Sequence, residues 1–162
     1  MTRHLLRTLA LKALVLACVA AAPRQGGPFC SNALVAGEWG YTKTGTIYLP
    51  TGAAAPFGST GTLALGANGY VTGTQLASVA GNLGGGTLYG TFTIEPACTG
   101  TMTVDVYDPS GTLLRTVSMS LVIDDFGREL RALVTSLVLP NGTSLPAVIT
   151  GGARRLFPGR GE

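Results

Sequence analysis

The amino-acid sequence predicts an all-β protein: an antiparallel up-and-down barrel of about eight strands, preceded by an N-terminal signal-peptide helix. Three observations predict it. The 162 residues suffice for one domain. Beyond residue 22, short segments alternate apolar and polar residues, and none shows helical periodicity of useful length. Turn signals separate these segments, and the 24 glycines and abundant threonines suit strands that reverse often.

Residues 1–22 have the features of a secretory signal peptide. A basic stretch (3–12) precedes an apolar run (13–22) that ends in small side chains. As a helix this run rises only about 15 Å, against a hydrocarbon core of roughly 30 Å. We expect cleavage before Ala22, an exported protein that is periplasmic or extracellular, and no membrane span in the mature chain.

The segment around Cys18 has a second interpretation. Val15-Leu16-Ala17-Cys18 resembles the cleavage box of bacterial lipoproteins, in which the cysteine carries lipid and becomes the mature N-terminus. A diacyl anchor at Cys18 would hold the barrel at a membrane surface.

Removal of the leader changes the charge of the chain. The full sequence carries a net charge of +3 and a pI near 9.0, and the excess comes from Arg3, Arg7 and Lys12. The remaining chain has equal numbers of basic and acidic residues. We therefore expect no nucleic-acid partner, because phosphate binding relies on excess positive charge.

The sequence lacks the residues that several kinds of catalytic and metal-binding site require. The single histidine, His4, lies in the leader, so the mature domain has no His-based triad, His general base or His-ligated zinc. Gly84–Gly86 precede no helix and form no phosphate loop, and Asp124–Gly127 fit a turn better than a calcium loop. We predict no catalytic residue, no metal site and no cofactor.

Two cysteines, Cys30 and Cys98, remain after the leader. In an exported protein they most simply form one disulfide, and closing so long a loop stabilises by roughly 4 kcal/mol through chain entropy. The alternative is a pair of unrelated buried thiols.

The alternating segments predict the strands one by one. In the first, Trp39, Tyr41 and Ile47 face one way while threonines between them face the other. The expected strands are 38–48, 61–66, 70–79, 87–95, 98–107, 113–123, 129–139 and 144–153.

Turn signals connect these strands. Asn68-Gly69 and Asn141-Gly142 predict tight hairpins, and Asp108–Gly111 predicts a type I turn. The glycine-rich run 81–86 predicts another reversal, whereas the Pro- and Ala-rich run 50–58 predicts a long loop.

Tight hairpins make sequence neighbours into antiparallel sheet neighbours, and closure buries the apolar face and removes exposed edges. A two-layer sandwich is the alternative; it needs longer crossing connections, which only the 50–58 run offers. The predicted organisation is a signal peptide (1–22), an N-terminal segment tethered by the disulfide (23–36), the barrel (37–155) and a flexible tail (156–162).

Several stretches of the sequence carry a family resemblance. They are Cys30-Ser31 with Gly37–Gly40, 90–101 (GTFTIEPACTGT), 121–130 (LVIDDFGREL) and 150–155 (TGGARR). Together they resemble a widespread group of secreted bacterial proteins of uncharacterised function. The resemblance implies export and a barrel of the calycin or allene-oxide-cyclase-like (lipocalin-like) kind, with no established activity. That group usually has Asp before the second cysteine, where this chain has Ala97.

Two basic residues fall on apolar faces. By strand parity Lys43 lies with Trp39 and Tyr41, and Arg115 lies with the apolar row that follows it. Such a charge is costly unless its head reaches water or a partner. One interpretation is a pocket lined by Trp39, Tyr41, Lys43 and Arg115 that binds an amphipathic anion. The other is that both heads extend to water at the barrel rim.

The remaining charges have structural interpretations. Parity places Glu95 and Asp105 outside the barrel. We expect ion pairs of Arg154 and Arg155 with Glu129 or Asp124.

Two functions from different classes fit this sequence. The first is an exported non-catalytic barrel that binds a small hydrophobic or amphipathic ligand or has a structural role. The second is a cyclase- or isomerase-type barrel enzyme that acts on a hydrophobic substrate without His or Cys.

Overall fold

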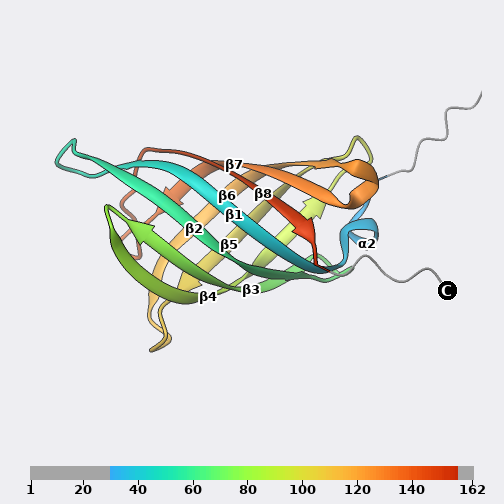
Figure 1. Cartoon of the computed structure of the whole chain (residues 1–162), viewed down its shortest axis with the longest axis horizontal. Helices are drawn as coiled ribbons and strands as arrows, with labels where there is room; N and C mark the ends of the chain where they lie inside the picture. The colour runs from blue at the N-terminus through green and yellow to red at the C-terminus, as the bar shows by residue number, and fades with distance from the viewer. Residues whose placement is uncertain (1–29, 157–162) are drawn as a thin grey trace, which may run out of the picture.

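The structure is a computed structural model and describes residues 30–156. Eight strands pair in sequence order, every pair antiparallel, and the first strand pairs with the last to close a barrel (Figure 1). This confirms the predicted fold class. The strands are β1 (Gly37–Tyr48), β2 (Ala54–Leu65), β3 (Tyr70–Val79), β4 (Asn82–Ile94), β5 (Thr99–Tyr107), β6 (Leu113–Asp124), β7 (Glu129–Val138) and β8 (Ala147–Arg155).

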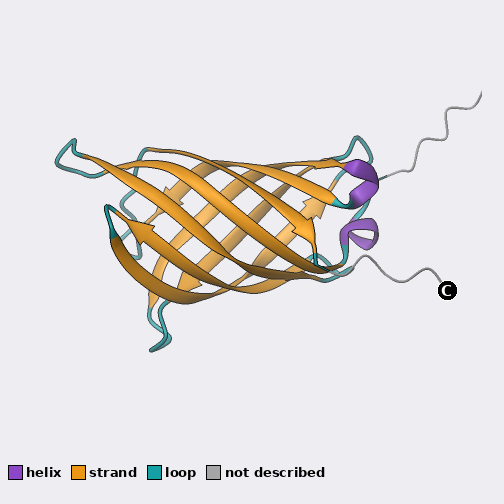
Figure 2. Cartoon of the chain, viewed as in Figure 1, coloured by secondary structure: helices purple, strands orange, loops and turns teal. Residues whose placement is uncertain are grey.

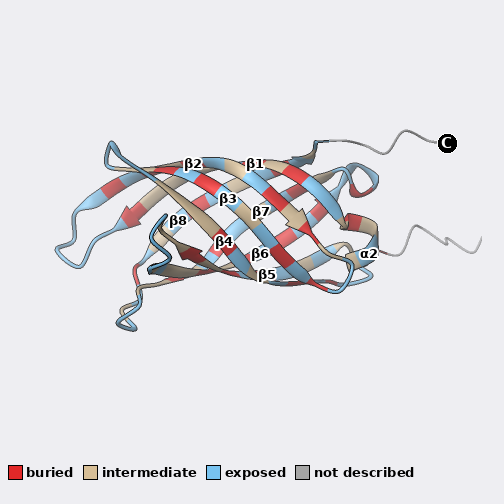
Figure 3. Cartoon of the chain, turned by 90° about the horizontal axis from the view of Figure 1, so that it is seen from below, coloured by how far each residue is buried: buried red, intermediate tan, exposed pale blue. Residues whose placement is uncertain are grey.

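Strand parity sorts the side chains as expected. Buried and exposed residues alternate along the strands (Figure 3). Met102, Val117 and Met119 are buried in the interior. On the outer surface, the hydroxyl groups of Thr103 on β5 and Ser118 on β6 form a hydrogen bond of 3.1 Å. The apolar face of each strand therefore meets those of the others in one core, as the hydrophobic effect requires.

The prediction of a long loop over residues 50–58 is wrong. Strand β2 begins at Ala54, so β1 and β2 form a hairpin with Leu49 N bonded to Ala53 O at 2.9 Å. The strand passes through Pro56, whose backbone nitrogen carries no hydrogen. The β2–β3 pairing starts one residue later, at Phe57 and Val79, so this proline interrupts no ladder bond between those strands.

The glycine-rich run 81–86 is also mostly strand. The reversal is confined to residues 80–81, both with positive φ (49° and 87°). Strand β4 starts at Asn82 and carries Gly84, Gly85 and Gly86 opposite Ala77, Leu76 and Gln75 of β3. Pairing with β3 keeps these residues extended despite the low strand propensity of glycine.

One end of the barrel is covered by the N-terminal part of the described chain (Figures 1 and 2). Helix α2 (Asn32–Val35) is capped by Ser31, whose side chain accepts from Leu34 N. A disulfide joins Cys30 to Cys98, with Cα atoms 4.9 Å apart. Val35 is completely buried against this end. The disulfide therefore fastens a short plug across the barrel.

The last turn before β7 has unusual backbone geometry. Between β6 and β7 the 3₁₀ turn η1 (Asp125–Gly127) places Asp125 and Phe126 at φ values of 47° and 54°. The turn predicted at residues 124–127 is thus present. The final hairpin starts as expected at Asn141-Gly142, but strand β8 begins at Ala147, three residues later than expected.

The predicted signal peptide and the Cys18 anchor lie outside the described residues, as does most of the predicted tail. Among residues 30–156, no helix has both the length and the apolar character needed to cross a membrane.

Candidate functional site

A group of polar side chains interrupts the otherwise apolar interior. Tyr41 and Lys43 come from β1, Ser59 from β2, Gln75 from β3 and Arg115 from β6. Each occupies an inward position of its strand: Tyr41, Ser59 and Gln75 are buried, and Lys43 and Arg115 are partly buried. Because polar groups are costly in an apolar core, this cluster is the candidate functional site.

The strand register holds these residues together. Lys43 lies directly opposite Ser59, and Tyr41 lies opposite Gly61. Gly61 in turn lies opposite Gln75, so no side chain stands between Tyr41 and Gln75 in that row. The Tyr41 hydroxyl donates to Thr74 O at 3.4 Å, which ties β1 to β3 through the interior.

The charged groups of Lys43 and Arg115 each lie over an aromatic ring. Lys43 Nζ lies 5.1 Å from the centre of the Tyr41 ring, and the Arg115 guanidinium carbon lies 5.9 Å from the centre of the Phe57 ring. Both distances fall within the range of cation–π attraction. Lys43 and Arg115 also line one small cavity of about 10 Å³, together with Gln75.

A second interior cavity, of about 30 Å³, also borders Lys43. Tyr41, Lys43, Leu88, Met102 and Met119 are among its lining residues. A cavity needs about 10–15 Å³ to hold one water molecule. Side chains therefore fill most of the barrel and leave room beside Lys43 for a group of only a few atoms.

Gly151 helps to make that room. It lies opposite Lys43 on β8, and a Cβ atom at this position would fall 2.5 Å from Lys43 Cγ. Only glycine leaves the lysine stem its present path along the barrel wall.

The low-polarity interior shifts the proton affinities of this cluster. Burial lowers the pKa of Lys43 to about 8, and the Arg115 charge adds to the effect. Burial also lowers the pKa of Arg115. Burial raises the pKa of Tyr41 to about 12, although Arg115 opposes that increase. These directions are those expected when a charge loses its hydration.

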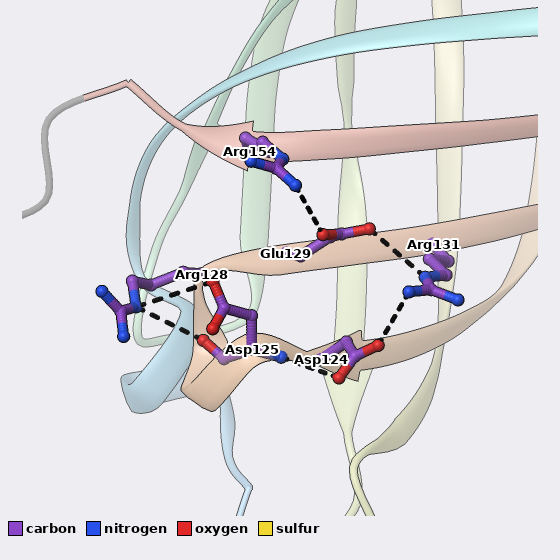
Figure 4. Close-up of polar contacts among 6 residues, drawn as sticks. All are labelled: Asp124, Asp125, Arg128, Glu129, Arg131 and Arg154. Carbon is purple, nitrogen blue, oxygen red and sulfur yellow. Dashed lines mark hydrogen bonds and ion pairs between the residues drawn. The ribbon is translucent and has the colours of Figure 1, made fainter.

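No carboxylate neutralises these cations within residues 30–156. The ion pairs in this part of the chain lie elsewhere, on the outer surface where β6, β7 and β8 meet (Figure 4). Ser59 Oγ, opposite Lys43, is buried and forms no hydrogen bond with another described residue. The cluster therefore carries positive charge without a carboxylate partner, and it includes a hydroxyl group without a hydrogen bond.

The four predicted ligand-binding residues do not all meet. Tyr41, Lys43 and Arg115 come together in the interior, as just described. Trp39 is completely buried nearer the plugged end, donates from Nε1 to Val35 O at 2.9 Å and stacks under Arg155 with 5.6 Å between the guanidinium carbon and the ring centre. It lines neither cavity and fastens the plug.

Sequence reasoning missed two members of the cluster. Gln75 shares its inward face with Val71 and Ala77, so the alternation in 70–79 could have identified it. Ser59 lies between the predicted loop 50–58 and the predicted strand 61–66, where the sequence predicts no element.

The other predicted charge placements are largely confirmed. Asp105 faces outward and accepts a hydrogen bond from Thr116 Oγ1, and Glu95 is exposed. Arg154 pairs with Glu129 at 3.1 Å (Figure 4). Arg155 instead points inward and donates to Leu34 O and Ala36 O. In the described part of the chain, no group of three or more His, Cys, Asp or Glu side chains is placed to hold a metal.

Comparison with known proteins returns neither a family nor a curated relative. No family model matches the chain. No curated protein matches it. The assignment to the secreted bacterial group described above therefore stays a prediction.

Solved structures with similar folds include three proteins. A redesigned β barrel, mFAP1, bound to DFHBI has 16% identity and a TM-score of 0.48, with 76% of this chain and 97% of that one covered. The S-type phycobiliprotein lyase CPES from Guillardia theta has 5% identity and a TM-score of 0.41 (79% and 92% covered). Rv2717c from M. tuberculosis has 15% identity and a TM-score of 0.39 (77% and 94% covered). None of them bears on what this interior binds.

Proposed function

We propose that this protein is an exported, non-catalytic barrel that binds a small amphipathic anion in its interior. One observation carries the proposal. Lys43 and Arg115 line the same interior cavity, and no acidic side chain among the described residues pairs with either.

A bound anion compensates for two like charges in the barrel interior. Two like charges in a poorly hydrated space repel each other and lose solvation, so each destabilises the empty barrel. An anion between them removes the repulsion and accepts charge-assisted hydrogen bonds, which are stronger than neutral ones. Gln75 borders the same cavity and offers an amide for the rest of the ligand.

The shape of the interior sets the size and polarity of the ligand. The cavities of about 10 and 30 Å³ have room for about one and about two water-sized groups, so only a small head group with a short apolar part can enter, and neighbouring side chains repack around it. Met102 and Met119 line the larger cavity, and their unbranched thioether side chains repack readily around an added methyl or ethyl group. A short-chain carboxylate meets both requirements.

Three features support export. The leader-like residues 1–22 precede the barrel, the Cys30–Cys98 disulfide suits an oxidising compartment, and the sequence resembles a secreted group. Lipid anchoring through Cys18 is an alternative form of the same proposal.

A titration series tests binding. Acetate, propanoate, butanoate and hexanoate are added to isotope-labelled protein, and amide shifts of β1, β3 and β6 are followed by NMR. Each acid is compared with the alcohol of equal length. We expect saturable shifts with at least one carboxylate and about tenfold weaker binding of its alcohol, the amount that one lost charge-assisted bond costs.

Variants with matched shape complete the test. Lys43→Met and Arg115→Met remove one charge each and keep an unbranched stem, and each should weaken carboxylate binding by about tenfold. Arg154→Met, whose side chain is 81% exposed, should bind like the parent protein. Alcohols that bind as well as acids, or no saturable shift with any acid, would overturn the proposal.

A further inference from the structure

We infer that Lys43 is a nucleophile that captures the carbonyl carbon of its ligand as an imine, with Arg115 holding the ligand's carboxylate. The ligand class is then a short 2-oxo acid. This inference rests on the proposed anion site and names the chemistry of its occupant.

The placement of Lys43 is the first support. It is the only lysine after Lys12 in the whole sequence. Lysine is among the residue types that most strongly prefer the surface, yet this side chain projects into the barrel from the middle of β1. Burial of a single amine in the interior costs folding free energy, which suggests that the amine has a functional role there.

The chemical state of the amine is the second support. Only the unprotonated form attacks a carbonyl group, and desolvation next to another cation is a general way to obtain it. With a pKa of about 8, about one quarter of the Lys43 amine is neutral at pH 7.5, against about one in a thousand for an ordinary lysine.

The surroundings of Lys43 are the third support. Lys43 borders both interior cavities, one apolar and one shared with Arg115. Gly151 opposite keeps the lysine stem free of steric contact. A guanidinium binds a carboxylate through two parallel hydrogen bonds, so Arg115 can hold the acid group of a 2-oxo acid while the adjacent carbonyl carbon faces Lys43.

The proposed step conserves atoms and electrons. Neutral Lys43 donates its lone pair to the carbonyl carbon, and the C=O π electrons move onto oxygen. A proton passes from nitrogen to that oxygen, which gives a carbinolamine. The hydroxyl group then leaves as water with one further proton from nitrogen, and a C=N bond forms. No oxidant or reductant takes part, and addition of water reverses the sequence.

Reductive trapping tests this step. The full chain is incubated with glyoxylate and sodium cyanoborohydride, which converts an imine into a stable carboxymethylated amine. Intact mass and peptide mapping then count and locate the modification. We expect the Lys43 peptide to be labelled at least tenfold faster than Lys12 or the N-terminal amine, and the labelling rate to rise through a midpoint near pH 8.

Three variants separate capture from general reactivity. Lys43→Arg keeps the charge, lacks a reactive amine and should remove the interior label. Arg115→Met should slow labelling by glyoxylate about tenfold more than labelling by the uncharged aldehyde propanal, which loses only the contribution of Arg115 to the lowered pKa of Lys43. Arg154→Met should label like the parent protein.

The outcomes distinguish this inference from the proposal beneath it. Glycolate has the size of glyoxylate and lacks the carbonyl group, so it should bind, leave no label and compete with glyoxylate. If both acids bind and Lys43 is labelled no faster than Lys12, capture is wrong and the anion site stands. If neither acid binds, the anion site itself is wrong.

Discussion

Gly151 and Lys43 face each other across β8 and β1, so closely that a Cβ atom on Gly151 would fall 2.5 Å from Lys43 Cγ and 2.7 Å from the carbonyl oxygen of Thr42. The position of the interior amine therefore depends on a missing side chain on the neighbouring strand. This relationship can be tested without changing any polar group.

Gly151→Ala should destabilise the protein and displace Lys43. Forcing one methyl group into this contact costs about 1–3 kcal/mol, and Lys43 has to leave its present path. Gly152→Ala is the matched control, since its Cβ meets nothing closer than 3.8 Å. Urea unfolding measures the stability and glyoxylate trapping measures the amine. Equal behaviour of the two variants would show that the close contact has no consequence.

The disulfide variant Cys30→Ser/Cys98→Ser should unfold at lower urea concentration. The bridge closes a loop with a sequence separation of 68, and its loss should cost about 4 kcal/mol through the entropy of the unfolded chain. Reduction of the parent protein should lower its stability by the same amount. A loss below about 1 kcal/mol would mean that the plug is held by its other contacts.

Stability should increase as the pH rises from 8 to 10. Lys43 has a pKa of about 8 in the folded protein, below the ordinary value of 10.5, so in this interval the unfolded chain binds a proton that the folded chain has released. Below pH 8 both states are protonated and the penalty of the buried charge is fully present.

Above about pH 10 the trend should weaken and then reverse, because the unfolded lysine also loses its proton while Tyr41 keeps its own to about pH 12 in the fold and the unfolded phenol does not. Guanidine unfolding across this range measures the effect. Lys43→Met is the control and should lack the rise between pH 8 and 10; a rise that persists in this variant would assign it to another group.

Arg155→Met should loosen the plug. The Arg155 guanidinium donates to Leu34 O and Ala36 O and lies over the Trp39 ring, so its loss leaves two carbonyl groups without these donors. We expect a destabilisation of about 1–3 kcal/mol and a change in the fluorescence of Trp39. Arg154→Met, one residue earlier and facing outward, should change both by less; equal effects would contradict the assigned role.

The sequence contained most of the information about the barrel wall. Alternation in 98–107 and 113–123 placed Met102 and Val117 inside, because side chains of an extended chain point to opposite faces in turn. The same rule placed Lys43 and Arg115 inside. Asn68-Gly69 and Asp108–Gly111 marked turns whose backbone conformations few other residues adopt.

Two predictions made from local sequence alone were wrong, because pairing between strands outweighed the local preference for a turn or loop. The runs 50–58 and 81–86 contain proline and glycine, which weaken a strand considered alone. In the folded chain residues 54–58 pair with β1 and residues 82–86 pair with β3, and these ladder bonds compensate for the poor local propensity.

The sequence by itself determined that alternate residues face a common interior, that a lysine and an arginine are among them, and that two cysteines follow residue 22. Only the tertiary structure decided that Tyr41, Lys43 and Arg115 meet while Trp39 joins the plug. The physical reason is that parity fixes the face on which a side chain lies, whereas its height and neighbours depend on register and closure, which arise from pairing between distant strands.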